Sequence, residues 1–82
     1  RHDLDSLDLI DAFLWSEEEW LKKTEGSAIR RIGFEQWLRN VAVALGNAKK
    51  SKVLIAALKR RKDYDSLLVK EHVQWALNQH SS

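Results

Sequence analysis

The chain has 82 residues, a formal net charge of +2, and no cysteine, methionine or proline. Without cysteine it has no disulfide, thiolate metal site or thiol nucleophile, and no apolar run approaches the roughly 18 residues of a membrane span. This length fits one small domain with a modest core, and the scarcity of helix breakers favours an all-α fold. The N-terminus lacks a signal-peptide layout, so we expect a cytoplasmic location and no membrane partner. A start at Arg1 and the absence of methionine suggest a fragment of a longer chain.

Apolar residues recurring at gaps of three and four predict a first helix over residues 6–14. Ser16 and Glu19 form a capping-box pattern that begins a second, short helix. We expect Trp20 and Leu21 to fix that helix to the core.

Gly26 is placed to end the second helix, and Ser27 to cap a short turn over residues 28–32. The next helix is predicted over residues 34–45, and Gly46 is expected to close it as a C-terminal glycine. The apolar stripe of this helix comprises Phe34, Trp37, Leu38, Val41, Ala44 and Leu45.

Two further helices are predicted over residues 51–61 and 66–79. The expected core residues of the first are Val53, Leu54, Ala57 and Leu58. Those of the second are Val69, Val73, Ala76 and Leu77.

The apolar stripes of two of these helices repeat at a constant offset of 32 residues. The matching positions are Trp37, Val41, Ala44 and Leu45 with Val69, Val73, Ala76 and Leu77. Helix pairs that recur at such a period are typical of HEAT-type solenoids. We therefore predict a single domain over residues 1–82, a short HEAT-like module of about five helices. The alternative is a chance similarity between two amphipathic helices.

The charges are strongly segregated along the chain. Residues 1–25 hold eight acids and three bases (net −5), residues 26–62 ten bases and one acid (net +9), and residues 63–82 three acids and one base (net −2). The basic block favours an anionic partner, most obviously nucleic acid. A solvated basic helix face is the alternative.

The sequence holds no motif for a self-contained active site, since HExxH, CxxC, a phosphate-binding glycine loop and a serine elbow are all missing. Asp5, Asp8 and Asp11 are spaced to share a helix face, and we interpret them as a solvated acidic face rather than a cation site. We expect no catalytic and no metal-binding residues here.

Basic and polar side chains surround the helix predicted over residues 34–45. Arginine offers planar bidentate contacts to phosphate and lysine a mobile point charge, and free amides near Ser27 and Phe34 would add an anion site. Ion pairs with the acidic first helices would be the structural alternative for Arg30 and Arg39, as would burial against backbone carbonyls for Arg31 and Arg39. The candidate RNA-binding residues are Ser27, Arg30, Arg31, Arg39, Asn40, Lys49 and Lys50.

The four tryptophans are interpreted as core residues rather than as platforms for stacked bases. They are Trp15, Trp20, Trp37 and Trp75.

Three motifs resemble the C-terminal end of the epoxyqueuosine reductase family: G-S-x-x-x-R-x-G, then L-R-N-x-x-x-A-L-G-N, then E-H-x-x-W-A-L. The matching residues here are Gly26, Ser27, Arg31 and Gly33; Leu38, Arg39, Asn40, Ala44, Leu45, Gly46 and Asn47; and Glu71, His72, Trp75, Ala76 and Leu77.

The resemblance implies an enzyme that reduces the epoxide of epoxyqueuosine in tRNA, with cobalamin and [4Fe-4S] clusters held in preceding domains. It implies that this chain is the accessory module that helps bind the tRNA anticodon stem-loop beside the catalytic domain of the same parent chain. Since the chain has no cysteine to hold a cluster, it should carry no cofactor and be inert alone. The alternative is a protein-interaction or structural module that docks onto the catalytic domain or an acidic partner.

Overall fold

The computed structural model describes the backbone of residues 6–81 and the side chains of residues 8–81. The predicted all-helical fold is confirmed, and the five helices predicted as residue ranges agree with the structure to within one residue at each end. The elements are α1 (Ser6–Phe13), α2 (Glu17–Lys23), the 3₁₀ helix η1 (Ala28–Ile32), α3 (Gly33–Gly46), α4 (Lys52–Arg60) and α5 (Leu67–Gln79).

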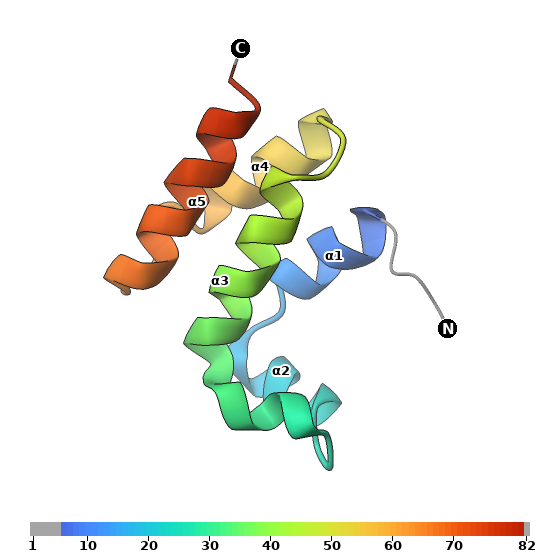
Figure 1. The fold of residues 1–82 in the computed structure, drawn as a ribbon. Helices are drawn as coiled ribbons and strands as arrows, with labels where there is room; N and C mark the ends of the chain where they lie inside the picture. Colours follow the sequence, from blue (N-terminus) through green and yellow to red (C-terminus); the bar gives the residue numbers. More distant parts are fainter. Residues whose placement is uncertain (1–5, 82) are drawn as a thin grey trace.

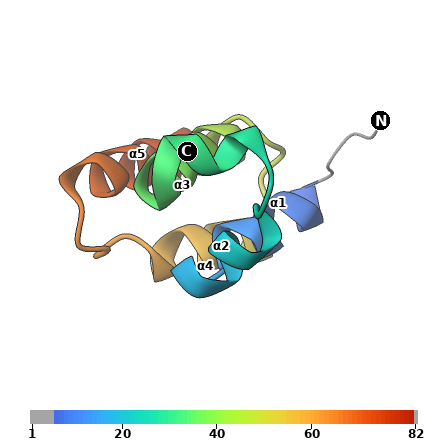
Figure 2. The same cartoon turned by 90° about the horizontal axis from the view of Figure 1, so that it is seen from below.

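The helices form two layers, with α3 and α5 in one and α1, α2 and α4 in the other (Figure 2). The Cα atoms span 40 × 31 × 15 Å, and the short dimension suits two helical layers about 8–10 Å apart. Helices α3 and α5 lie side by side and run in the same direction (Figure 1). Ser66 donates to Glu35 where the two helices begin, and His80 Nε2 bonds the Leu45 carbonyl oxygen at 2.8 Å where they end.

Serine side chains begin three of the five α-helices. The capping box at α2 is confirmed: the Glu19 amide donates to Ser16 Oγ at 3.1 Å, and the Ser16 amide donates to Glu19 Oε1 at 3.0 Å. Ser51 and Ser66 accept from amides in the first turns of α4 and α5. Each such cap contributes about 1 kcal/mol, which explains why local sequence fixes these boundaries.

The core lies between the two layers. Its largest fully buried side chains are Phe13, Trp20, Leu38, Leu45, Leu54, Leu58, Val69 and Val73. One predicted core residue of α2 and one of α4 are wrong: Leu21 is 37% exposed and Val53 is 57% exposed. Each adjoins a buried residue, Trp20 or Leu54, and successive side chains diverge by about 100° around a helix.

Gly46 has a different role from the predicted one. It is the last residue of α3, without a positive φ, and the C-cap is Asn47 with φ −97°. A Cβ at Gly46 would lie 2.4 Å from Trp75 Cζ3 and 3.1 Å from the Ala76 Cα. The glycine therefore allows α5 to approach α3 closely. Gly26 has a left-handed φ of 76°, but α2 ends at Lys23 with Thr24 as its C-cap, so this glycine lies in the turn that follows rather than at the end of the helix.

No helix within residues 6–81 is long and apolar enough to cross a membrane.

Candidate nucleic-acid interface

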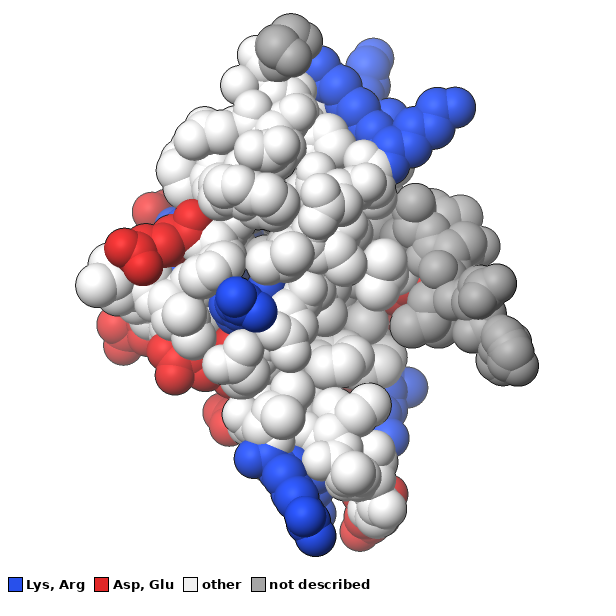
Figure 3. Space-filling view, in the orientation of Figure 1, with Lys and Arg blue, Asp and Glu red and all other residues white. Residues whose placement is uncertain are grey.

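The seven candidate residues lie along α3 rather than in one cluster. Ser27, Arg30 and Arg31 belong to η1 and its cap, at the start of α3. Lys49 and Lys50 follow the end of α3, which at 14 residues is about 21 Å long. On the α3–α5 face, lysine and arginine side chains appear at the lower end, in the middle and at the upper right edge, with uncharged surface between them (Figure 3). The five cations among the candidate residues are Arg30, Arg31, Arg39, Lys49 and Lys50, and we call them the basic line.

The η1 end of the basic line presents side chains rather than free amides. The Ile29 amide donates to Ser27 Oγ at 3.2 Å, the Arg30 amide to the Ser27 carbonyl at 3.1 Å, and the Gly33 amide to the Arg30 carbonyl. These amides are already satisfied, so the anion site expected from free amides does not form on them. Arg30 and Arg31 are exposed and have no polar partner among residues 8–81, so ion pairs with the acidic helices do not occupy them.

Arg39, in the middle of the line, is half-buried rather than directed freely outward. Its Nε donates to His72 Nε2 at 3.2 Å, and its Nη1 donates to Asn40 Oδ1 at 3.0 Å. His72 Nδ1 lies 2.8 Å from the Leu68 carbonyl oxygen, so Nδ1 carries the proton and Nε2 is free to accept. Both hydrogen-bond partners of Arg39 are therefore neutral, so neither hydrogen bond cancels its positive charge.

The buried structural role considered for Arg31 and Arg39 belongs instead to Arg61, which the sequence did not single out. Arg61 Nε donates to the Phe13 carbonyl oxygen at 3.1 Å, and Nη2 donates to that of Trp15 at 2.6 Å. Its guanidinium also lies 5.8 Å from the Phe34 ring centroid and 5.5 Å from that of Tyr64. Burial lowers the pKa of Arg61 from its ordinary value, but a guanidinium remains charged in proteins.

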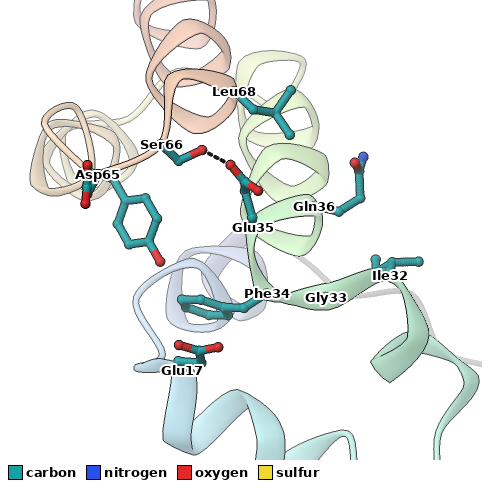
Figure 4. A pocket seen from close by; sticks show the side chains of 10 residues that line it. Glu17, Ile32, Gly33, Phe34, Glu35, Gln36, Asp65, Ser66 and Leu68 are labelled. Carbon is teal, nitrogen blue, oxygen red and sulfur yellow. Dashed lines mark hydrogen bonds between the residues drawn. The ribbon is translucent and has the colours of Figure 1, made fainter.

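A cleft of about 500 Å³ opens between the start of α3 and the loop before α5 (Figure 4). Carboxylates of Glu17, Glu35 and Asp65 line it, and Glu35 accepts the hydrogen bond from Ser66. Acidic side chains also gather at the left edge of the α3–α5 face in Figure 3. A polyanion is repelled from this region, so the cleft marks one limit of any nucleic-acid surface. The acids come from three separate segments, and no local pattern pointed to the cleft.

Tyr64, which also lines the cleft, has a raised pKa because burial disfavours its phenolate and the Glu17 carboxylate repels it. Its folded-state pKa exceeds the usual 10.0, so the stabilising contribution is present below pH 10 and is lost as pH rises through the folded value. Tyr64 is the only tyrosine of the chain. We therefore expect tyrosinate absorbance of the folded protein to titrate with a midpoint above 10. The same titration in denaturant should return to about 10, and equal midpoints would contradict the prediction.

The tryptophans divide into two groups. Trp20 is buried, and Trp15 and Trp37 are half-buried and stack with ring centroids 5.9 Å apart and an interplanar angle of 4°. These three fit the predicted core role. Trp75 does not, because it is 37% exposed on α5.

Within residues 6–81, no three histidine or carboxylate side chains converge to hold a metal ion. Asp11 accepts a hydrogen bond from Trp15 Nε1 at 3.3 Å, and Asp8 is exposed. Asp5, the third member of the predicted acidic face, lies outside the described residues.

The described residues thus form an all-helical fold of two layers packed around a shared apolar core. The chain is 56% identical over 80 residues to epoxyqueuosine reductase of Pseudomonas aeruginosa, 58% over 80 to that of Xanthomonas campestris pv. campestris, and 54% over 79 to that of Escherichia coli. These alignments cover 98%, 98% and 96% of this chain.

The chain thus belongs to the same family as one segment of the epoxyqueuosine reductases, which confirms the resemblance seen in the motifs. It spans about a fifth of the length of these curated relatives, 22%, 22% and 21% respectively. No protein-family model and no solved structure gives a significant match to the chain.

Proposed function

We propose that this chain is a HEAT-like helical-repeat module that binds the anticodon stem-loop of tRNA for an epoxyqueuosine reductase. The observation that carries the proposal is the basic line along α3. Arg30 and Arg31 are exposed there without polar partners among residues 8–81, and Arg39 donates its hydrogen bonds to neutral side chains. Helical basic surfaces recognise RNA through its shape and backbone. The name of the relatives supports a substrate that contains epoxyqueuosine.

The HEAT-like part of the proposal is supported by the parallel packing of α3 and α5 in one layer, with the other α-helices in a second. A helix-pair solenoid places equivalent helices of successive repeats side by side and parallel. The 32-residue offset between the two apolar stripes is the sequence counterpart of that packing.

The parent protein, on this proposal, reduces epoxyqueuosine to queuosine in tRNA in the cytoplasm with cobalamin and [4Fe-4S] clusters. The residues here do not fit the clusters, because cysteine thiolates hold them and this chain has none. No step of the reaction is assigned to this chain, which contributes RNA binding beside the catalytic domain.

Removing two charges from the η1 end tests the proposal. Arg30→Ala with Arg31→Ala should weaken binding of anticodon stem-loop RNA and reduce the slope of log K against log salt by about 1–2, because each phosphate contact releases counterions. The matched control is Arg60→Ala with Lys62→Ala. It removes two exposed charges, one at the C-terminal residue of α4 and one two residues beyond it. Fluorescence anisotropy at several salt concentrations measures both. Equal salt-dependence slopes for the two double variants would show that η1 does not contact the RNA.

Docking onto the catalytic domain is the second candidate. Ile29 and Ile32, which flank the two arginines of η1, are 44% and 43% exposed, as in a protein contact. If this surface meets protein instead, stem-loop RNA should not compete with the catalytic domain for the chain.

A further inference from the structure

A shallow groove of about 270 Å³ opens between α3 and α5, midway along the basic line. Arg39 and Val43 line it from α3, and Glu71, His72 and Trp75 line it from α5. Two motifs that carried the resemblance, L-R-N and E-H-x-x-W, are therefore brought together across one groove. The volume is just below the range of about 300–1,000 Å³ typical of drug-sized ligands, so the groove suits a single planar ring system.

The wall formed by Trp75 is both exposed and fixed. Its ring packs so closely on Gly46 that a Cβ there would lie 2.4 Å from Cζ3 and 3.0 Å from Cε3. With one side of the indole against the α3 backbone, 37% of the residue remains accessible. An aromatic side chain held this way offers a flat surface whose orientation needs no further ordering when a second ring stacks on it.

The polar side of the groove is also pre-arranged. Arg39 is held by His72 and Asn40, which occupy its Nε and Nη1 atoms and leave Nη2 free to donate. Because both partners are neutral, the guanidinium attracts an anion or an acceptor-rich ring edge at the groove. Glu71, exposed at the rim, supplies acceptor oxygens for ring amino groups.

We propose that this groove binds one unpaired nucleobase of the RNA, stacked on Trp75 with its polar edge toward Arg39. An aromatic platform beside an arginine is the arrangement by which proteins hold bases of single-stranded RNA loops. The surrounding charges agree with this occupant. The cations at the two ends of the basic line can contact the RNA phosphates on either side of the bound base. The inference rests on the proposed RNA binding and adds the recognition of a loop base to contacts with phosphates.

The test compares two RNAs: an anticodon stem-loop, and the same stem-loop with abasic loop nucleotides. Trp75→Ala should bind the first RNA about 5- to 150-fold more weakly than the unaltered chain, the loss typical of one stacked base, and the abasic RNA equally well. Leu67→Ala is the matched control, because Leu67 is 72% exposed on the same helix and outside the groove. Circular dichroism confirms that each variant is folded.

Tryptophan fluorescence gives a second readout that does not depend on an alanine variant. Loop bases should quench the unaltered chain on binding and the abasic RNA should not, while Trp75→Phe should bind without that quenching. Equal affinity of Trp75→Ala and the unaltered chain for the normal stem-loop would contradict base binding in the groove, but not the proposed phosphate contacts.

An equal loss of affinity for both RNAs would also contradict base binding in the groove. If Trp75→Ala instead lost only its association with the catalytic domain, the groove would be a protein contact. No binding of either RNA by the unaltered chain would overturn both proposals.

Discussion

Replacing Arg61 with alanine should lower the free energy of unfolding by about 2–4 kcal/mol. A hydrogen bond to a charged group contributes about 1.5–3 kcal/mol, and the two made by Arg61 together contribute less than their sum because the side chain is only half-buried. The side chain donates to two carbonyls, those of Phe13 and Trp15. Phe13 is the last residue of α1, where carbonyls have no partner within the helix, and Trp15 lies two residues beyond it. A domain of this size is stabilised by only about 4–12 kcal/mol, so the loss is a large fraction of the total.

The aromatic neighbours of Arg61 add to the effect. Its guanidinium faces the rings of Phe34 and Tyr64, and such contacts contribute roughly 0.5–1 kcal/mol where water is present. One side chain thereby connects the end of α4 to the end of α1 and the start of α3. Thermal unfolding should move down by roughly 8–30 °C for the alanine variant, given about 4–8 °C per kcal/mol in small domains.

Two comparisons separate this role from a general effect of charge. Arg60→Ala removes the neighbouring exposed arginine and should change stability by no more than about 0.5 kcal/mol. Arg61→Lys should fall between the two, because one ammonium group does not reproduce the forked pair of donors. Urea unfolding curves measure all three, and equal losses for Arg60→Ala and Arg61→Ala would show that the carbonyl contacts contribute nothing.

The helices could be predicted because their signals are local. Ser16, Ser51 and Ser66 cap amides within three residues, and the left-handed Gly26 lies in the turn after α2. Apolar spacing then identified the buried face of each helix, with errors no larger than one position in the sequence. It failed at Leu21 and Val53, where adjacent apolar residues compete for the core and only the packing of the whole domain decides which one is inside.

The partners of the basic side chains could not be predicted, because they are distant in sequence. Arg39 meets His72 33 residues away, and Arg61 meets Phe13 48 residues away. Periodicity shows which way a side chain points on its own helix, but not which element lies opposite. Arg61 also sits in a run of four basic residues, 59–62, in which nothing local distinguishes it. The surroundings of the basic line therefore become visible only once α3 is packed against α5.

Gly46→Ala should lower the free energy of unfolding by about 1–3 kcal/mol, the usual cost of forcing extra atoms into a packed interface. The new Cβ would meet the Trp75 ring at 2.4 Å and the Ala76 Cα at 3.1 Å. The ring is large and the Cα belongs to the backbone, so the clash is relieved only by moving Trp75 or by separating α5 from α3. Alanine gains about 1 kcal/mol in helix propensity over glycine, which reduces the cost without removing it.

The background Trp75→Ala provides the decisive control. With the indole gone, the two shortest contacts of the new methyl group disappear and the 3.1 Å contact to Ala76 remains, so Gly46→Ala should cost much less there than in the unaltered chain. The difference between the two backgrounds, measured by urea unfolding, should be about 0.5–3 kcal/mol, as for residues in direct contact. If Gly46→Ala stabilised the chain equally in both backgrounds, the glycine would matter only for helix propensity. In that case the close approach of α5 to α3 would impose no requirement at residue 46.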